Sequence, residues 1–254
     1  MTLQVGRALG KGVAKTLSKA GLTLLVLFGL VQIAFLAATN TLVEAWLAGL
    51  DLPAGTTQAS ASTPLSLPIS ATVAGVIALV VLLLLQILTI VLIRVMAADR
   101  QVIARETYTR RMIWVLADSV AAGIIVGVLT MLGFVLLVIP GLFLTVSLLF
   151  TTVYIADEDE NLLSAIRDSW DLASGNRWRL FGLYLVVIVS FMIVSFAVEF
   201  VLPTGSTLSL AASTVVNTAL LVYMLAVITS AYRQLRDENR IEGGSESGSD
   251  AVGA

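Results

Sequence analysis

The chain contains no histidine and no cysteine, and only 13% of its 254 residues are charged. Histidine is the commonest general base and metal ligand in proteins, and cysteine supplies disulfides, nucleophilic thiolates and zinc ligands. Their absence excludes a disulfide framework and a thiolate metal site, and it removes much of ordinary enzyme chemistry. The few charges are also nearly balanced, with 15 Lys and Arg against 17 Asp and Glu.

Apolar residues are correspondingly abundant. They make up 58% of the chain, and the mean hydropathy is +0.97, which is well outside the range of soluble proteins. The composition predicts an integral membrane protein. We expect one all-α membrane domain at residues 1–235, and a disordered acidic tail at 236–254 because that segment is rich in Gly and Ser.

Long apolar segments predict a polytopic membrane helix bundle with six transmembrane helices. The central segment, Ser119 to Ala156, has no charged side chain, and as one helix it would be roughly twice the ~30 Å thickness of the hydrocarbon layer. It is therefore expected to form a hairpin that crosses twice. The other four helices are expected at residues 21–39, 71–96, 178–201 and 208–232.

The predicted turn of this hairpin is the run from Val138 to Gly141, because of Pro140 and Gly141. Proline has no N–H and disfavours helical geometry in the residue before it, and glycine tolerates the positive φ of a tight turn.

Three connecting segments have recognisable patterns. Residues 1–19 place apolar and basic side chains four apart on separate stripes, which predicts a basic interfacial helix rather than a cleaved leader. Residues 41–70 are rich in Thr, Ser, Ala, Gly and Pro and predict an outer loop, whose start could rest on the interface as a short helix. Residues 157–176 predict a cytoplasmic amphipathic helix that buries Leu162, Leu163, Ile166 and Trp170 and stops at Gly175.

The basic residues set the expected topology. All fifteen fall in the N-terminus, the even-numbered connections or the tail, so both termini are expected in the cytoplasm of a multi-pass cell-membrane protein. The strip from Arg94 to Arg111 is interpreted as a solvated face, with anionic lipid headgroups as the alternative.

Candidate chemistry is sparse. No ionisable residue lies near the centre of a predicted membrane helix, where it would indicate a functional site. The acidic run Asp157 to Glu160 is interpreted as the cap of the following helix, with a divalent cation site as the weaker reading. Gly123 and Gly127 are expected to pack closely against another helix of the chain, more than to form a dimer. No catalytic, cofactor-binding or metal-ligating residue is predicted.

One combination of residues carries a resemblance. Pro140 and Gly141, an apolar pass, an acidic turn, Trp170 and the run Gly175, Asn176, Trp178 and Arg179 follow one another in that order. This arrangement resembles the membrane domain of the glycerophosphoryl diester phosphodiesterase family and related six-helix families of unknown function. The resemblance implies the fold. The activity is not implied, because the soluble phosphodiesterase domain of some members has no counterpart here.

Three classes of function remain. A non-enzymatic membrane module that organises lipids or partner proteins, in the membrane or the cytoplasm, fits best. A transporter or channel for a small solute is the alternative, and an intramembrane enzyme is disfavoured by the missing chemistry. The lipid bilayer is the expected partner, and nucleic acid is not.

Overall fold

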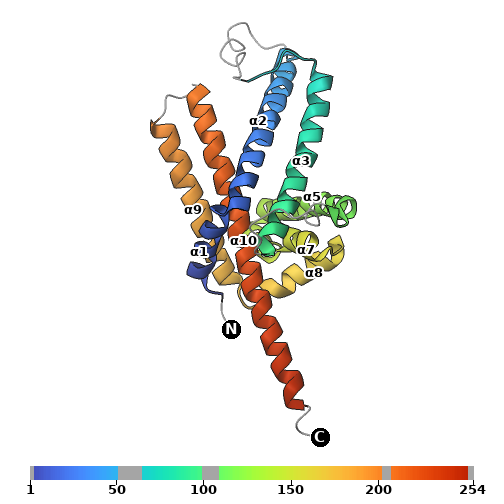
Figure 1. Ribbon diagram of the computed structural model, residues 1–254. Helices are drawn as coiled ribbons and strands as arrows, with labels where there is room; N and C mark the ends of the chain where they lie inside the picture. Colours follow the sequence, from blue (N-terminus) through green and yellow to red (C-terminus); the bar gives the residue numbers. More distant parts are fainter. Residues whose placement is uncertain (1–2, 51–64, 99–108, 202–206, 251–254) are drawn as a thin grey trace.

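The structure is a computed structural model that describes residues 3–50, 65–98, 109–201 and 207–250 (Figure 1). Within these residues the regular elements are all helices, and six helical segments are long and apolar enough to cross a membrane. The predicted all-α class is therefore confirmed. The side chains of Glu199, of residues 207–210 and of residues 240–250 are not described.

Helices α2 (Lys19–Ala48) and α3 (Ala71–Ala97) form one antiparallel pair. Ser18 and Ser70 cap their N-termini, because each side chain accepts a backbone N–H three residues on, at 3.1 and 3.4 Å. The α2 helix continues to Ala48, so the part of the expected outer loop from 41 to 48 is helical instead. Nothing between Thr39 and Ala48 is a helix breaker, and the first proline comes at position 53.

Helices α9 (Arg177–Val201) and α10 (Thr207–Asp250) form the second pair (Figure 1). The sequence also predicts a short turn between them at Pro203 to Gly205, and these residues lie outside the described part of the chain. The α10 helix continues through residues 236–250, where a disordered tail was expected. No proline interrupts this stretch, and extending an existing helix costs much less than starting one.

Helix α1 (Val5–Thr16) packs on α10 through its smallest residues. Ala8, Gly12 and Thr16 are buried, and a Cβ on Gly12 would collide with the side chain of Val227. The expected apolar stripe is divided, because Val5 and Leu9 pack against the core whereas Val13 and Leu17 are 47% and 65% exposed. Close approach of two backbones, rather than side-chain volume, selects the buried face.

The central hairpin turns earlier than expected. Helix α5 (Met112–Leu136) ends before Leu137, which is extended at φ −165° and ψ 148°, and α6 (Val138–Ser147) begins directly after it. The prediction that Pro140 and Gly141 form the turn is therefore wrong. Pro140 lies in the first turn of α6, where its missing N–H costs nothing because these groups have no partner within the helix.

Gly141 has a packing role. It is buried inside α6, and a Cβ there would lie 2.6 Å from Cγ of Phe134. On the facing arm, a Cβ on Gly133 would lie 2.9 Å from Cα of Gly141. The two glycines allow α5 and α6 to touch along their backbones.

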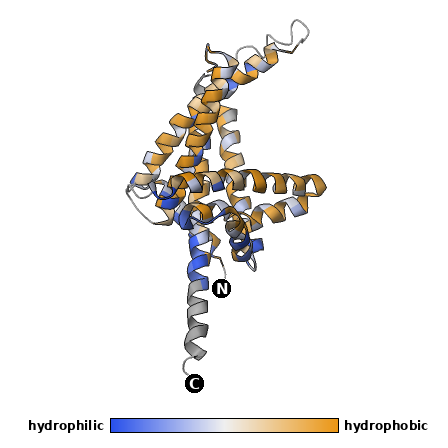
Figure 2. Ribbon diagram, turned by 90° about the vertical axis from the view of Figure 1, so that its right-hand side faces the viewer, coloured by the Kyte–Doolittle hydropathy of each residue, from blue (hydrophilic) through white to orange (hydrophobic). Residues whose placement is uncertain are grey.

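The hairpin lies across the two helix pairs instead of alongside them (Figures 1 and 2). Its apolar outer half projects from the rest of the molecule, and the five residues of its tip from Val135 to Ile139 are each at least 62% exposed. The return arm is broken after Ser147 and continues as α7 (Thr151–Glu158).

Helix α8 (Leu162–Ala173) follows, as expected for the amphipathic segment. Asn161 caps it by accepting the Ser164 N–H at 3.0 Å. The predicted buried face is rotated, because Ala165, Ser169, Leu172 and Ala173 are buried whereas Leu163 is 77% exposed.

The core lies at one end of the helix pairs. It contains the last turns of α3, the apolar residues of α7, the starts of α5 and α9, and the middle of α10. Its largest buried side chains include Ile90, Ile93, Phe150, Ile155, Leu180, Leu183 and Tyr232.

Candidate functional site

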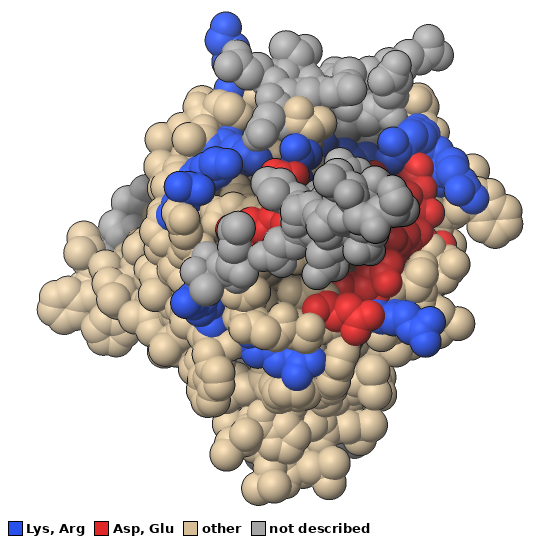
Figure 3. All heavy atoms as spheres, turned by 90° about the horizontal axis from the view of Figure 1, so that it is seen from below, with Lys and Arg blue, Asp and Glu red and all other residues tan. Residues whose placement is uncertain are grey.

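A cluster of charges lies at the core end of the molecule, where acidic side chains gather among basic ones (Figure 3). Arg94 of α3 is its most buried member, with a side chain only 5% exposed. Its Nε donates to the Ala156 carbonyl at 2.6 Å, and its Nη2 donates to Asp159 Oδ1 at 2.7 Å. The interpretation of Arg94 as part of a solvated strip is therefore wrong for this residue.

Further cations complete the cluster. Arg110 contacts the other oxygen of Asp159 at 2.8 Å and the Asp157 carbonyl at 2.7 Å. On α10, Arg236 pairs with Glu158 at 2.5 Å, and the Tyr232 hydroxyl donates to the same carboxylate. The acids therefore end α7 instead of capping α8. Carboxylates at a helix C-terminus are unfavourable alone, and the arginines of α3 and α10 compensate them.

This cluster joins α3, α7 and α10, and each of its charges that we describe has an opposite partner. In the described part of the chain no group of three or more acidic, histidine or cysteine side chains could hold a metal ion. We interpret the cluster as an electrostatic contact that holds α3, α7 and α10 together.

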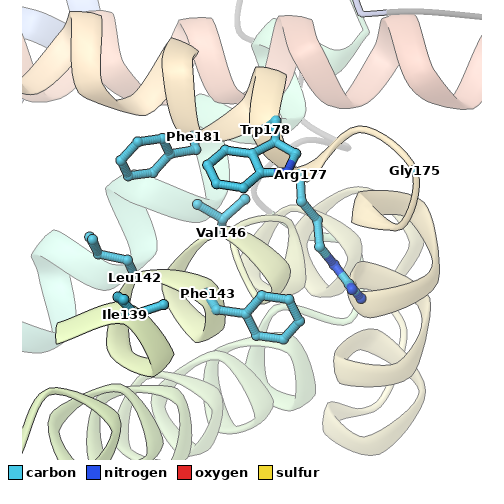
Figure 4. Close-up of a pocket in the computed structure, with 8 residues that line it drawn as sticks. All are labelled: Ile139, Leu142, Phe143, Val146, Gly175, Arg177, Trp178 and Phe181. Atoms are coloured by element: carbon cyan, nitrogen blue, oxygen red, sulfur yellow. The ribbon is translucent and has the colours of Figure 1, made fainter. Parts of the chain in front are cut away.

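A cavity of about 600 Å³ lies between α6 and the beginning of α9 (Figure 4). Its walls are almost wholly apolar, and Arg177 is the one charged residue among them. The lining residues are Ile139, Leu142, Phe143 and Val146 of α6, Gly175 of the preceding turn, and Arg177, Trp178 and Phe181 of α9. We call this cavity the α6–α9 groove.

The Arg177 side chain runs along one wall of the groove toward Phe143 (Figure 4). Its guanidinium carbon lies 4.5 Å from the centroid of the Phe143 ring and 4.8 Å from that of Trp170, and the two rings meet edge to face at 5.4 Å. Cation–π contacts hold the guanidinium in place without neutralising it. Among the described residues it has no ion pair, and its buried Nε has no hydrogen-bond partner.

The turn before α9 places this arginine. Gly175 has φ +79°, as expected for a left-handed helix stop. Asn176 directly precedes α9, and its carbonyl accepts the Leu180 N–H at 2.9 Å. Its side-chain oxygen accepts the Leu3 N–H at 3.3 Å, which ties the N-terminus to this turn.

Most residues of the sequence motif meet at the groove. Gly175 and Trp178 line it, Trp170 holds the Arg177 guanidinium, and Pro140 and Gly141 lie within the stretch of α6 that forms the opposite wall. Trp178 is 86% exposed, and the next residue, Arg179, is also exposed. Most of the motif residues are therefore neighbours in the structure. Arg177 and Phe143, which also lie there, were not among the predicted site residues.

The glycines that make close helix contacts are not the ones that the sequence predicted. Gly123 and Gly127 are exposed, and a Cβ on either would meet nothing within 4 Å among the described residues. The predicted close packing within the chain is therefore not found there. Gly12, Gly133 and Gly141 make the close approaches instead.

Two carboxyl groups share a site between α7 and α8. Burial raises the pKa of Glu160 to about 7, and the charge of Asp168 and the hydrogen bond with it add to the increase. One Glu160 oxygen is buried without a partner. With a pKa of about 7, Glu160 is about half protonated at neutral pH.

Comparison with known proteins gives a family for this arrangement. A domain family of unknown function, DUF7847, matches residues 3–235. The chain belongs to the DUF7847 family. No curated protein and no solved structure matches it.

The DUF7847 match covers α1 through the buried part of α10, so it includes the groove and all of the charge cluster except Arg236. It ends where the acidic tail begins. The family description assigns no activity, and the resemblance to the phosphodiesterase membrane domain stays a prediction.

Proposed function

We propose that this DUF7847 protein is a non-enzymatic membrane module that organises lipid, and that the α6–α9 groove holds one acyl chain of an anionic phospholipid. The supporting observation is the Arg177 guanidinium, which has no ion pair among the described residues and lies on the wall of an apolar cavity. An arginine recognises a phosphate through several N–H groups at once. The apolar walls suit the chain that is attached to that phosphate.

The headgroup supplies the selectivity in this proposal. A lipid chain that moves from the bilayer into the groove stays in an apolar environment, so it gains packing but no hydrophobic free energy. A partly exposed ion pair is worth up to ~1 kcal/mol, which corresponds to a preference of about five-fold. We therefore expect the protein to prefer anionic over zwitterionic lipid by about this factor.

Native mass spectrometry of the purified protein, titrated with phosphatidylglycerol or phosphatidylcholine, tests this. The Arg177→Gln variant should lose the preference for phosphatidylglycerol while its total lipid binding changes little. Arg179→Gln is the matched control, because it removes the same charge two residues away at a position outside the groove lining. Equal loss in both variants would show a general effect of charge and contradict the assignment of the groove.

The transporter alternative currently rests on the number of membrane helices alone. The motif residues gather at a groove on the side of α6 and α9, so the module reading is the one that this site supports.

A further inference from the structure

The outer tip of the central hairpin faces the beginning of α9 across the α6–α9 groove. Ile139 follows the turn at Leu137 by two residues, and it lines the same cavity as Arg177 and Trp178, the first two residues of α9. If the hairpin crossed the membrane alongside α9, its tip would lie near the other end of that helix. The 25 residues of α9 make that end about 36 Å away.

The beginning of α9 belongs to the end of the molecule where the charges gather. Asn176 is hydrogen-bonded to Leu3, and the next backbone N–H, that of Gln4, donates to the Gln234 side chain of α10 at 3.4 Å. Nearby, Lys15 donates to the Met96 carbonyl at 2.6 Å at the end of α3. The two ends of the hairpin and its turn therefore lie at the same level along the helix pairs, which is the level of the basic residues.

We propose that the α5–α6 hairpin lies within the leaflet on the basic side and never reaches the opposite side, so that only α2, α3, α9 and α10 cross the membrane. Its occupant is the hydrocarbon of that leaflet. The distal hairpin has no polar face that could rest on water, since its exposed side chains include Ile124, Val128, Met131, Leu132, Val135 and Leu136. An amphipathic interfacial helix would need such a face.

The turn leaves few backbone N–H groups unpaired, as a position in hydrocarbon requires. Unpaired backbone groups are costly in hydrocarbon, and each helix opens with N–H groups that lack partners. At the start of α6, Pro140 contributes no N–H, and the Gly141 N–H donates to the Leu137 carbonyl at 3.3 Å. Among the first four residues of α6, only Val138 and Ile139 therefore have a backbone N–H that still needs a partner. The contact between Gly133 and Gly141 lets the two arms close around this turn.

Cross-linking in native membranes tests the proposal, because the chain has no cysteine of its own. Ile139, Trp178 and Phe200 are 79%, 86% and 83% exposed, so cysteine at these positions leaves the core intact. A short bismaleimide should join the pair Ile139→Cys and Trp178→Cys within one chain. The matched pair Ile139→Cys and Phe200→Cys should stay open. Closure of the second pair, or a link between two chains, would overturn the proposal.

Labelling with a membrane-impermeant thiol reagent gives an independent test of whether the hairpin crosses. Leu65→Cys, between α2 and α3 at the opposite end, should be labelled from the far side, whereas Leu137→Cys should not be. Far-side labelling of Leu137→Cys would show that the hairpin crosses and would overturn the proposal. The proposal does not depend on what the groove binds, because neither assay measures lipid.

Discussion

Arg94 and Asp159 form an ion pair of 2.7 Å across 65 residues of sequence, and their side chains are only 5% and 13% exposed. Arg94 lies near the end of α3, and Asp159 follows α7 in the left-handed conformation, with φ 56°. Both charges would be costly in this place if either were alone. The pair therefore fixes how α7 meets α3.

The first prediction concerns this pair. Arg94→Gln removes a charged hydrogen bond from Asp159, which keeps Arg110 as its other cation, so this variant should lower the free energy of unfolding by about 1.5–3 kcal/mol. Asp159→Asn keeps a residue that tolerates positive φ and should cost a similar amount. The double variant should cost less than the sum, as measured by denaturant unfolding in detergent. Asp237→Asn, an exposed carboxylate on α10, should change little. Strictly additive losses would contradict the pairing.

The second prediction concerns the hairpin glycines. Leucine at position 141 must displace the Phe134 ring and backbone, so Gly141→Leu should destabilise the protein by about 1–3 kcal/mol, as overpacking does. Leucine at position 127 meets open space among the described residues, so Gly127→Leu should melt like the parent in detergent. If Gly127→Leu is the more damaging variant, the described packing of the hairpin is wrong.

These glycines show where sequence reasoning succeeds and where it does not. Composition and segment length predict the helices, because burial in lipid demands long apolar runs, and α3 lies within one residue of its expected bounds. A small residue, in contrast, shows only that close approach is possible. Gly123 and Gly127 have the spacing of a packing motif and remain exposed, whereas Gly133 and Gly141 meet across a turn that no fixed spacing reveals.

The candidate site was only partly predictable for a similar reason. The motif residues from Gly175 to Arg179 were recognised as a group, and they do border the groove. That the Arg177 guanidinium lies over an aromatic ring at the groove depends on where Phe143 lies, and Phe143 comes from another helix. Likewise, the buried state of Arg94 follows from Asp159 and the Ala156 carbonyl. A single sequence carries no signal for such partners.

The third prediction is a pH dependence that arises from Glu160. Its pKa is raised from 4.5 to about 7 in the folded protein, so the folded state binds a proton that the unfolded state has already released between these values. Stability therefore falls as the pH rises from about 4.5 to 7 and stays low above that range. Glu160→Gln should remove this decrease and melt at a higher temperature than the parent at pH 8.5, with little difference at pH 4.

Asp168→Asn provides the control for this effect, since it removes the neighbouring charge and should relieve the same penalty in part. Thermal unfolding in detergent across the pH range measures both variants. If the parent and Glu160→Gln show the same pH profile, the raised pKa of Glu160 contributes nothing to the pH dependence of stability.

The most direct test of lipid binding in the groove is photo-cross-linking with a phosphatidylglycerol that carries a diazirine on one acyl chain. In liposomes, adducts should concentrate on the peptides that contain residues 139–146 and 177–181. Labelling there should fall in Arg177→Gln and persist in Arg179→Gln, and the phosphatidylcholine analogue should label these peptides less. Equal labelling of all lipid-exposed helices by both analogues would contradict the account.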